Sequence, residues 1–161
     1  MRKILGFAAV VALTAPGLGA CGSGRGGATA DRPLGVQAPP AGSAGAATSG
    51  GAVERFLGAA RASDYRTMGF VFGTAQGAIA ARDDANDVEK RMRALACYLT
   101  HDRAQQVEDV PGSGRERVVT VQLTQRTLTK RTRFTTVPGP AGRWYVRAFD
   151  VEPIADFCRS G

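Results

Sequence analysis

Beyond residue 51 the chain has two regions, which differ in the spacing of their apolar residues. Between residues 52 and 100, apolar residues recur three or four positions apart, the spacing that gathers them on one face of an amphipathic helix. The longest such stripe lies in 86–100 and consists of Val88, Met92, Leu95 and Leu99. Two shorter helices are predicted before it, the second capped by Asp64. The Gly- and Ala-rich segment 74–84 is expected to form a loop with at most one turn of helix.

Beyond His101 the period changes to two, which is typical of strands with one buried face. In 117–124, threonine and glutamine alternate with Val119, Val121 and Leu123. Further strands are predicted at 103–110, 129–137 and 143–151. Helices followed by an antiparallel meander indicate a single α+β domain over 52–161, with N-terminal helices packed on one face of a curved antiparallel sheet.

The first 21 residues have the pattern of a bacterial lipoprotein signal peptide. Arg2 and Lys3 precede an almost wholly apolar run, and Leu18-Gly19-Ala20-Cys21 has the order of a lipobox. The apolar run is shorter than the roughly 20 residues that a membrane span requires. We therefore predict a signal peptide at 1–20, cleavage before Cys21 and lipidation of that cysteine. An ordinary secretory signal that contains a cysteine by chance is the alternative interpretation.

Lipidation of Cys21 would define where the protein works. The acyl chains would insert into the lipid bilayer and hold the exported domain at the cell membrane or the outer membrane, outside the cytoplasm. The next segment, 21–51, consists mainly of Gly, Ala, Ser, Thr and Pro, with Leu34 and Val36 as its only large aliphatic residues. Because such a segment buries too little apolar surface to offset the entropy of ordering, we predict a flexible linker there.

Charge and composition restrict the chemistry of the domain. The formal charge of +7 falls to +5 once Arg2 and Lys3 leave with the signal peptide, but an exported location argues against nucleic acid as the partner. The single histidine, His101, has no ligand-spaced cluster around it, so we expect no metal and no cofactor. The sequence contains neither a Gly-x-Ser-x-Gly elbow nor a Cys–His nucleophile pattern, and we assign no catalytic residue.

Arginine is concentrated in the strand region. Arg131 and Arg133 are two positions apart and therefore share one face of a strand, and Arg147 on a hairpin partner could join them. This basic surface would suit an anionic envelope component or an acidic partner protein. The alternative is a solvated sheet face that binds nothing.

The remaining cysteines predict a cross-link. Cys97 and Cys158 are the only thiols left once Cys21 carries lipid, and an exported domain lies where disulfides persist. We therefore expect a disulfide bond between them. Cys97 falls on the side of its helix opposite the apolar stripe, so the segment after Pro153 is expected to fold back over that outer side.

The predicted order of elements resembles the cone-shaped domain of the nuclear transport factor 2-like superfamily. The residues that carry the resemblance are Ala52-Val53-Glu54-Arg55-Phe56-Leu57 in the first helix and Gly142-Arg143-Trp144-Tyr145-Val146 in the last strand. The chain is similar in particular to small bacterial lipoproteins of unknown function that carry such a domain behind a linker. The resemblance implies a fold but no single function, since members range from isomerase- and dehydratase-like enzymes to non-catalytic binding modules.

Two hypotheses about function follow. In the favoured one, the chain is a membrane-anchored envelope lipoprotein whose domain binds a ligand or a partner without catalysis. In the alternative, it is a small isomerase- or dehydratase-like enzyme that acts on an apolar ligand inside the cone. A deep cavity with a buried carboxylate would favour the enzyme, and an interior filled with side chains would favour the binding domain.

Overall fold

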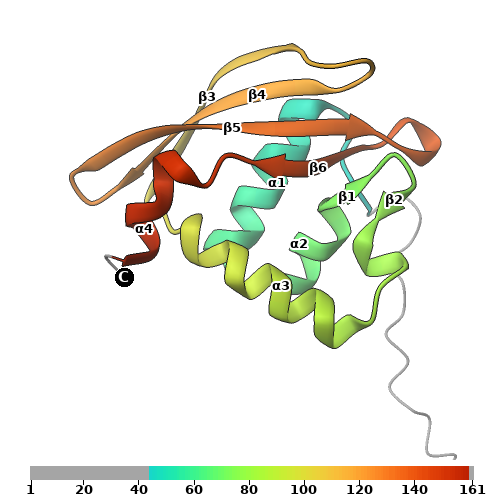
Figure 1. Ribbon diagram of the computed structural model, residues 1–161, viewed down its shortest axis with the longest axis horizontal. Helices are drawn as coiled ribbons and strands as arrows, with labels where there is room; N and C mark the ends of the chain where they lie inside the picture. The colour runs from blue at the N-terminus through green and yellow to red at the C-terminus, as the bar shows by residue number, and fades with distance from the viewer. Residues whose placement is uncertain (1–43, 160–161) are drawn as a thin grey trace, which may run out of the picture. The chain divides into compact units, whose positions relative to one another are not determined.

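Helices and two antiparallel sheets make up residues 44–159, the part of the chain that the computed structural model describes (Figure 1). The helices are α1 (Ser49–Arg61), α2 (Tyr65–Val71), α3 (Ala85–Tyr98) and α4 (Ala155–Arg159). Short 3-10 turns span Ile79–Ala81, Pro140–Gly142 and Glu152–Ile154. Within this described range, no helix has the length and apolarity that crossing a membrane demands.

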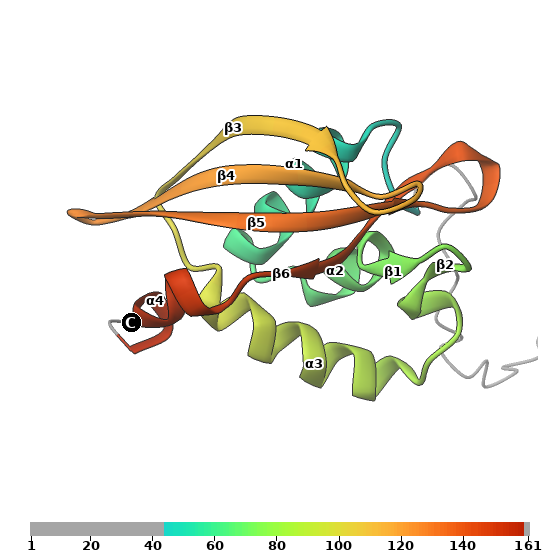
Figure 2. The same ribbon diagram turned by 45° about the horizontal axis from the view of Figure 1, so that its top comes forward.

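The main sheet is an antiparallel meander whose strands are hydrogen-bonded in chain order. They are β3 (Arg103–Pro111), β4 (Arg117–Gln125), β5 (Leu128–Pro138) and β6 (Trp144–Phe149). Helices α1, α2 and α3 lie against one face of this sheet, and β3 and β4 arch over them (Figures 1 and 2). The predicted α+β class, with helices preceding an antiparallel sheet, is confirmed.

The core lies between the helices and the sheet, where the two predicted periods meet. In α3, the apolar stripe buries Val88, Met92 and Leu99, each at most 3% exposed. In β4, Val119, Val121 and Leu123 face the same core and are at most 2% exposed. Both patterns were predicted to be buried faces, and both predictions are confirmed.

Aspartate side chains cap the starts of α2 and α3, and the cap at Asp64 was predicted from the sequence. The Asp84 carboxylate accepts hydrogen bonds from the first turn of α3. The Asp64 carboxylate accepts from the Thr67 N–H at 2.9 Å at the start of α2. Hydrogen bonding from the Thr67 side chain, reinforced by its backbone N–H, holds the pKa of Asp64 below its ordinary value of 3.8.

The predicted linker, 21–51, extends too far toward the domain. Helix α1 begins at Ser49 behind the N-cap Thr48, and Ala46 pairs with Trp144 in an isolated bridge. The sequence misleads here because the segment is buried through small residues and backbone hydrogen bonds instead of large apolar side chains. At Gly45, for example, a Cβ would lie 2.7 Å from the Trp144 carbonyl oxygen, so only glycine fits. The folded unit therefore includes Ala44 onward.

The segment predicted as a loop, 74–84, contains a small hairpin. Strand β1 (Gly73–Thr74) pairs with β2 (Gly77–Ala78), and the 3-10 turn over Ile79–Ala81 follows. Each strand has only two residues, too few to show a period of two in the sequence. Ala78 and Ile79 are nevertheless buried, so the hairpin covers one end of the core.

Candidate functional site

Aromatic side chains pack between α1 and the part of the sheet that β5 and β6 form. The Phe56 ring centroid lies 5.7 Å from that of Phe72 and 6.4 Å from that of Phe149, and Phe149 lies 5.4 Å from Phe134. Phe56 and Phe134 are fully buried. These rings occupy the volume beneath the sheet in which a ligand of a cone-shaped enzyme would have to lie.

The buried polar side chains of the domain carry hydroxyl, amide and imidazole groups. The buried polar residues of the described part of the chain are Ser49, His101, Gln125, Thr132 and Thr136, and a carboxylate is not among them. Within residues 44–159, every deeply buried side-chain nitrogen or oxygen has a hydrogen-bond partner. A buried carboxylate held near a cavity, which would favour the enzyme hypothesis, is therefore not a feature of the described core.

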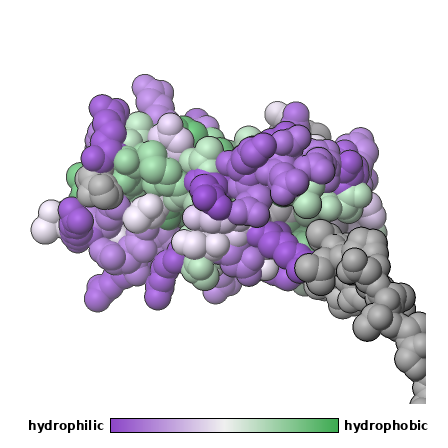
Figure 3. Space-filling model, turned by 90° about the horizontal axis from the view of Figure 1, so that it is seen from below, coloured by the Kyte–Doolittle hydropathy of each residue, from purple (hydrophilic) through white to green (hydrophobic). Residues whose placement is uncertain are grey.

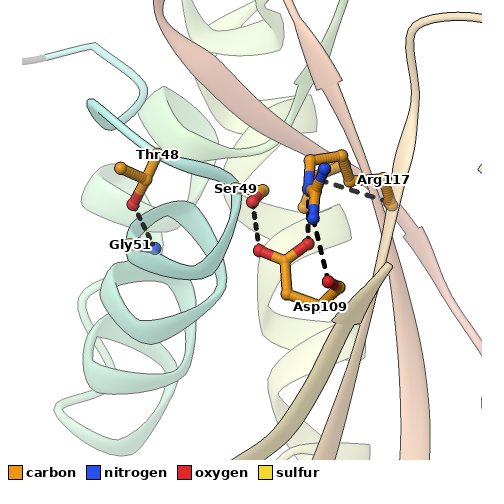
Figure 4. Close-up of polar contacts among 6 residues, drawn as sticks. Thr48, Ser49, Gly51, Asp109 and Arg117 are labelled. Carbon is orange, nitrogen blue, oxygen red and sulfur yellow. Dashed lines mark hydrogen bonds and ion pairs between the residues drawn. The ribbon is translucent and has the colours of Figure 1, made fainter. Parts of the chain in front are cut away.

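A polar cluster ties the start of α1 to the sheet (Figure 4). The Ser49 hydroxyl donates to the Asp109 carboxylate on β3, and the Arg117 Nε on β4 donates to the same carboxylate at 2.5 Å. A second Arg117 nitrogen donates to the Asp109 carbonyl oxygen at 2.8 Å. One arginine thus holds both the side chain and the backbone of Asp109, which orients the carboxylate toward Ser49.

This cluster has the chemistry of a clamp. The Ser49 hydroxyl donates to a carboxylate whose charge Arg117 already neutralises, and the three side chains together connect α1 to β3 and β4. The one histidine of the chain lies elsewhere, near the end of α3. Sequence reasoning missed the cluster because Ser49 was assigned to the linker and lies 60 positions from Asp109.

The three arginines predicted to form a basic surface are all exposed and lie on two neighbouring strands, β5 and β6. Arg131 and Arg133 lie on the face of β5 that points away from the helices, as their spacing predicted, and both are exposed. Arg133 Nε donates to Asp150 at 2.9 Å, and Arg131 reaches the amide oxygen of Gln122 at 3.4 Å. Arg147 lies at an irregularity of the β5–β6 pairing and forms an ion pair with Glu116. The surface therefore carries both signs of charge.

The outward face of the sheet is chemically uniform apart from these charges. Opposite Arg133 and Arg131 on β4 lie Thr120 and Gln122. Gln122 is in turn opposite Gln105 on β3. No described helix covers this face (Figures 1 and 2). It offers hydroxyl, amide and guanidinium groups on a broad surface.

The two cysteines of the domain are joined. Cys97 on α3 and Cys158 on α4 form a disulfide, with their Cα atoms 4.9 Å apart. Ile154 and Phe157 of the C-terminal segment are fully buried. The segment after Pro153 therefore packs against the rest of the domain through its apolar side chains, with the disulfide connecting it to α3.

His101 and Asp102 do not form a pair. The His101 Nδ1 lies 2.6 Å from the Leu99 carbonyl oxygen, to which it donates. The Asp102 carboxylate accepts from the Arg126 N–H at 2.6 Å, in the turn between β4 and β5. His101 therefore stabilises the turn after α3, whereas Asp102 connects the segment before β3 to the turn between β4 and β5.

Two further predictions concern the lipid and metals. Cys21 and the signal peptide over 1–20 lie outside the described residues. Within 44–159, no group of three or more His, Cys, Asp or Glu side chains is arranged to hold a metal ion.

Comparison of the chain with protein-family models, with curated proteins and with solved structures gave no match.

Proposed function

We propose that the chain is an envelope lipoprotein, anchored to a bilayer through acylated Cys21, whose domain binds a ligand or a partner without catalysing a reaction. The filled space beneath the sheet carries the non-catalytic part of this proposal. Because Phe56, Phe134 and Phe149 occupy the space beneath β5 and β6, we place the ligand on the outside of the domain.

The anchor is supported by the Leu18-Gly19-Ala20-Cys21 sequence behind a charged start and a short apolar run. The Cys97–Cys158 disulfide fits an exported domain, since disulfides persist outside the reducing cytoplasm. The order of three helices before an antiparallel meander supports membership of the nuclear transport factor 2-like superfamily, in its non-catalytic branch.

The anchor is tested with Cys21→Ala in the full chain. Lipidation at Cys21 predicts that the wild-type protein fractionates with membranes and carries acyl chains on its first residue, and that the variant is unprocessed or released. An unchanged mature mass and unchanged membrane fractionation of the variant would contradict the proposal.

The outward sheet face is the proposed contact with an anionic envelope component or an acidic partner. Replacing Arg131, Arg133 and Arg147 with Ser should weaken binding of the Cys21→Ala chain to phosphatidylglycerol vesicles. The binding that remains should fall with salt, since exposed charges are screened within about 10 Å at 0.1 M.

The matched control makes the same change of charge on the helix side of the domain. It replaces Arg82, Lys90 and Arg91 with Ser, all exposed residues. Equal binding by the two triple variants would show that the sheet face is only a solvated surface.

A further inference from the structure

A depression of about 330 Å³ lies where α1 ends, α2 begins and α3 ends. Arg61 and Ser63 line it from the end of α1, Tyr65 from α2, and Arg93, Thr100 and His101 from α3 and the turn after it. The helix side of the molecule that contains it is largely hydrophilic, with an apolar area toward the α4 end (Figure 3). The depression therefore brings together polar groups from three segments that are distant in the sequence.

The charges that line this depression are positive. The Arg93 guanidinium stacks on the Tyr65 ring, 5.2 Å from its centroid, and donates to Glu89 at 2.7 Å. One Arg61 nitrogen reaches the Asp102 carbonyl oxygen at 3.3 Å, which leaves its other nitrogens available to a ligand. Among the described residues that line the depression there is no carboxylate. Two oriented guanidinium groups without a lining carboxylate favour an anion.

The nearest acidic side chains are already engaged. Asp64 caps α2 through the Thr67 N–H, and Asp102 accepts from the Arg126 N–H. The carbonyl ends of α1 and α3 face the same region and oppose an anion with a partial negative charge. Glu89 neutralises Arg93 through their ion pair, so the Arg61 guanidinium is the positive charge that attracts an anion against these partial charges.

His101 adds a hydrogen-bond acceptor to this basic surface. Its side chain is 7% exposed, and Nδ1 donates to the Leu99 carbonyl oxygen at 2.6 Å. Because a carbonyl oxygen only accepts, the hydrogen of this bond is on Nδ1, and Nε2 is the ring nitrogen left to meet a ligand. Nε2 has no partner among the described residues, and His101 lines the depression. The site therefore combines two cationic donors with one acceptor that requires a hydroxyl hydrogen.

We propose that this depression binds a phosphate that carries a hydroxyl hydrogen or lies beside one: inorganic hydrogen phosphate, or the glycerol phosphate unit of an envelope lipid or polymer. Arg61 and Arg93 bind the anionic oxygens, and His101 Nε2 accepts the hydroxyl proton. The inference goes beyond the proposed function, because it adds a binding site on the helix side of the domain, away from the outward sheet face.

Calorimetry on the full chain, purified without a histidine tag in detergent, tests this assignment. Inorganic phosphate should bind one per chain, and sulfate at least tenfold more weakly, because sulfate at pH 7 has no hydroxyl to donate to Nε2. Tighter binding of glycerol 3-phosphate than of phosphate identifies a headgroup or polymer as the source, and weaker or equal binding identifies free phosphate. Absence of binding by both phosphates, or equal binding of phosphate and sulfate, overturns the proposal.

Variants assign the binding to the named residues. Arg61→Met should lose about tenfold in phosphate affinity, the loss of one charge-assisted hydrogen bond. His101→Asn, which retains a donor for the Leu99 carbonyl oxygen, should remove the preference for phosphate over sulfate. Arg82→Met is the matched control, since it removes the same charge from an exposed position that does not line the depression, and it should bind like the wild type.

A measurement on the unmodified chain keeps the test valid if a variant fails to fold. The chain has one histidine, so the ¹⁵N signals of an imidazole ring belong to His101 alone. Phosphate should shift the Nε2 signal, and sulfate should leave it nearly unchanged. An Nε2 signal that does not respond to phosphate contradicts the assignment. Loss of membrane fractionation in Cys21→Ala tests the anchor separately, so the two proposals can fail independently.

Discussion

The two sides of the main sheet use the same strands for different purposes. On the helix side, Val121, Leu123 and Phe134 are at most 2% exposed and form the core. On the outward side, Gln122 and Arg131 lie opposite each other on the same two strands and are solvated or half-solvated. Alternation along one strand thus separates the residues that stabilise the domain from those that could meet a partner.

The polar groups on the two sides differ in the same way. On the helix side, the Asp109 side chain is 21% exposed and is shared by Ser49 and Arg117. On the outward side, Arg133 and Asp150 pair while 69% and 46% exposed. Because water screens the second pair much more than the first, similar ion pairs should make unequal contributions to stability.

The largest expected contrast comes from one strand, β5. Phe134→Ala should lower the free energy of unfolding by about 4 kcal/mol, since it leaves a cavity in a fully packed core. Arg131→Ala, three positions earlier on the outward face, should change it by less than about 0.5 kcal/mol. Urea denaturation followed by circular dichroism measures both. Similar losses in the two variants would show that the outward face is covered in solution.

Removing the disulfide shows how much of the domain's stability comes from packing alone. Replacing both Cys97 and Cys158 with Ala should lower the free energy of unfolding by about 3 kcal/mol, a typical loss for a closed loop of this kind. Wild-type protein unfolded with and without a reducing agent provides the control. If the two wild-type curves coincide and mass spectrometry recovers free thiols, the bond is not present in the purified protein.

The next smaller effect is the difference in unfolding free energy lost when Asp109 or Asp150 is replaced. Asp109→Asn should cost about 1.5 kcal/mol, because it weakens charge-assisted bonds to Arg117 and the bond from Ser49. Asp150→Asn should cost about 0.3 kcal/mol or less, as expected of an exposed pair. Urea denaturation at low and high salt compares the two, and only the Asp150 effect should disappear in 1 M salt. The reverse order of losses would contradict the assignment of the clamp to the helix side.

The smallest effect is a dependence on pH in the helix layer. The pKa of Asp64 is lower in the folded domain than its ordinary 3.8, so the stability it contributes is complete above that value and is lost as pH falls through the folded pKa. Asp64→Asn keeps the cap but has no charge to lose. The difference in unfolding free energy between the two proteins should be constant near neutral pH and shrink below about pH 4. A difference that stays constant to pH 2.5 would exclude this contribution.

The spacing of apolar residues in the sequence predicted most of the helices and strands. Strand β4 was predicted because its apolar residues alternate over several positions. Helix α3 was predicted because its apolar stripe has four residues at helical spacing. The β1–β2 hairpin was not, since two residues cannot display a period. The segment 44–48 was missed because the hydrogen bonds and close contacts that bury it belong to the backbone, and composition does not record them.

The polar sites were harder to predict than the core. Ser49, Asp109 and Arg117 come from three elements, and only the fold brings them together. The depression at the helix ends draws its lining in the same way from Arg61, Arg93 and His101. The spacing of Arg131 and Arg133 predicted that they share one face of a strand. The sequence did not predict that Asp150 pairs with Arg133 or that Glu116 pairs with Arg147.

The position of the disulfide has a mechanical consequence. Its two cysteines are 61 residues apart and enclose all four strands of the main sheet in one covalent loop. A force applied at the two ends of the domain passes from α3 to α4 through the sulfur atoms and bypasses β3 to β6. Stretching the oxidised protein should therefore release about 200 Å less chain than stretching the reduced protein, at about 3.4 Å for each residue. The covalent loop therefore keeps β3 to β6 from being extended by the force, whichever helix unfolds first.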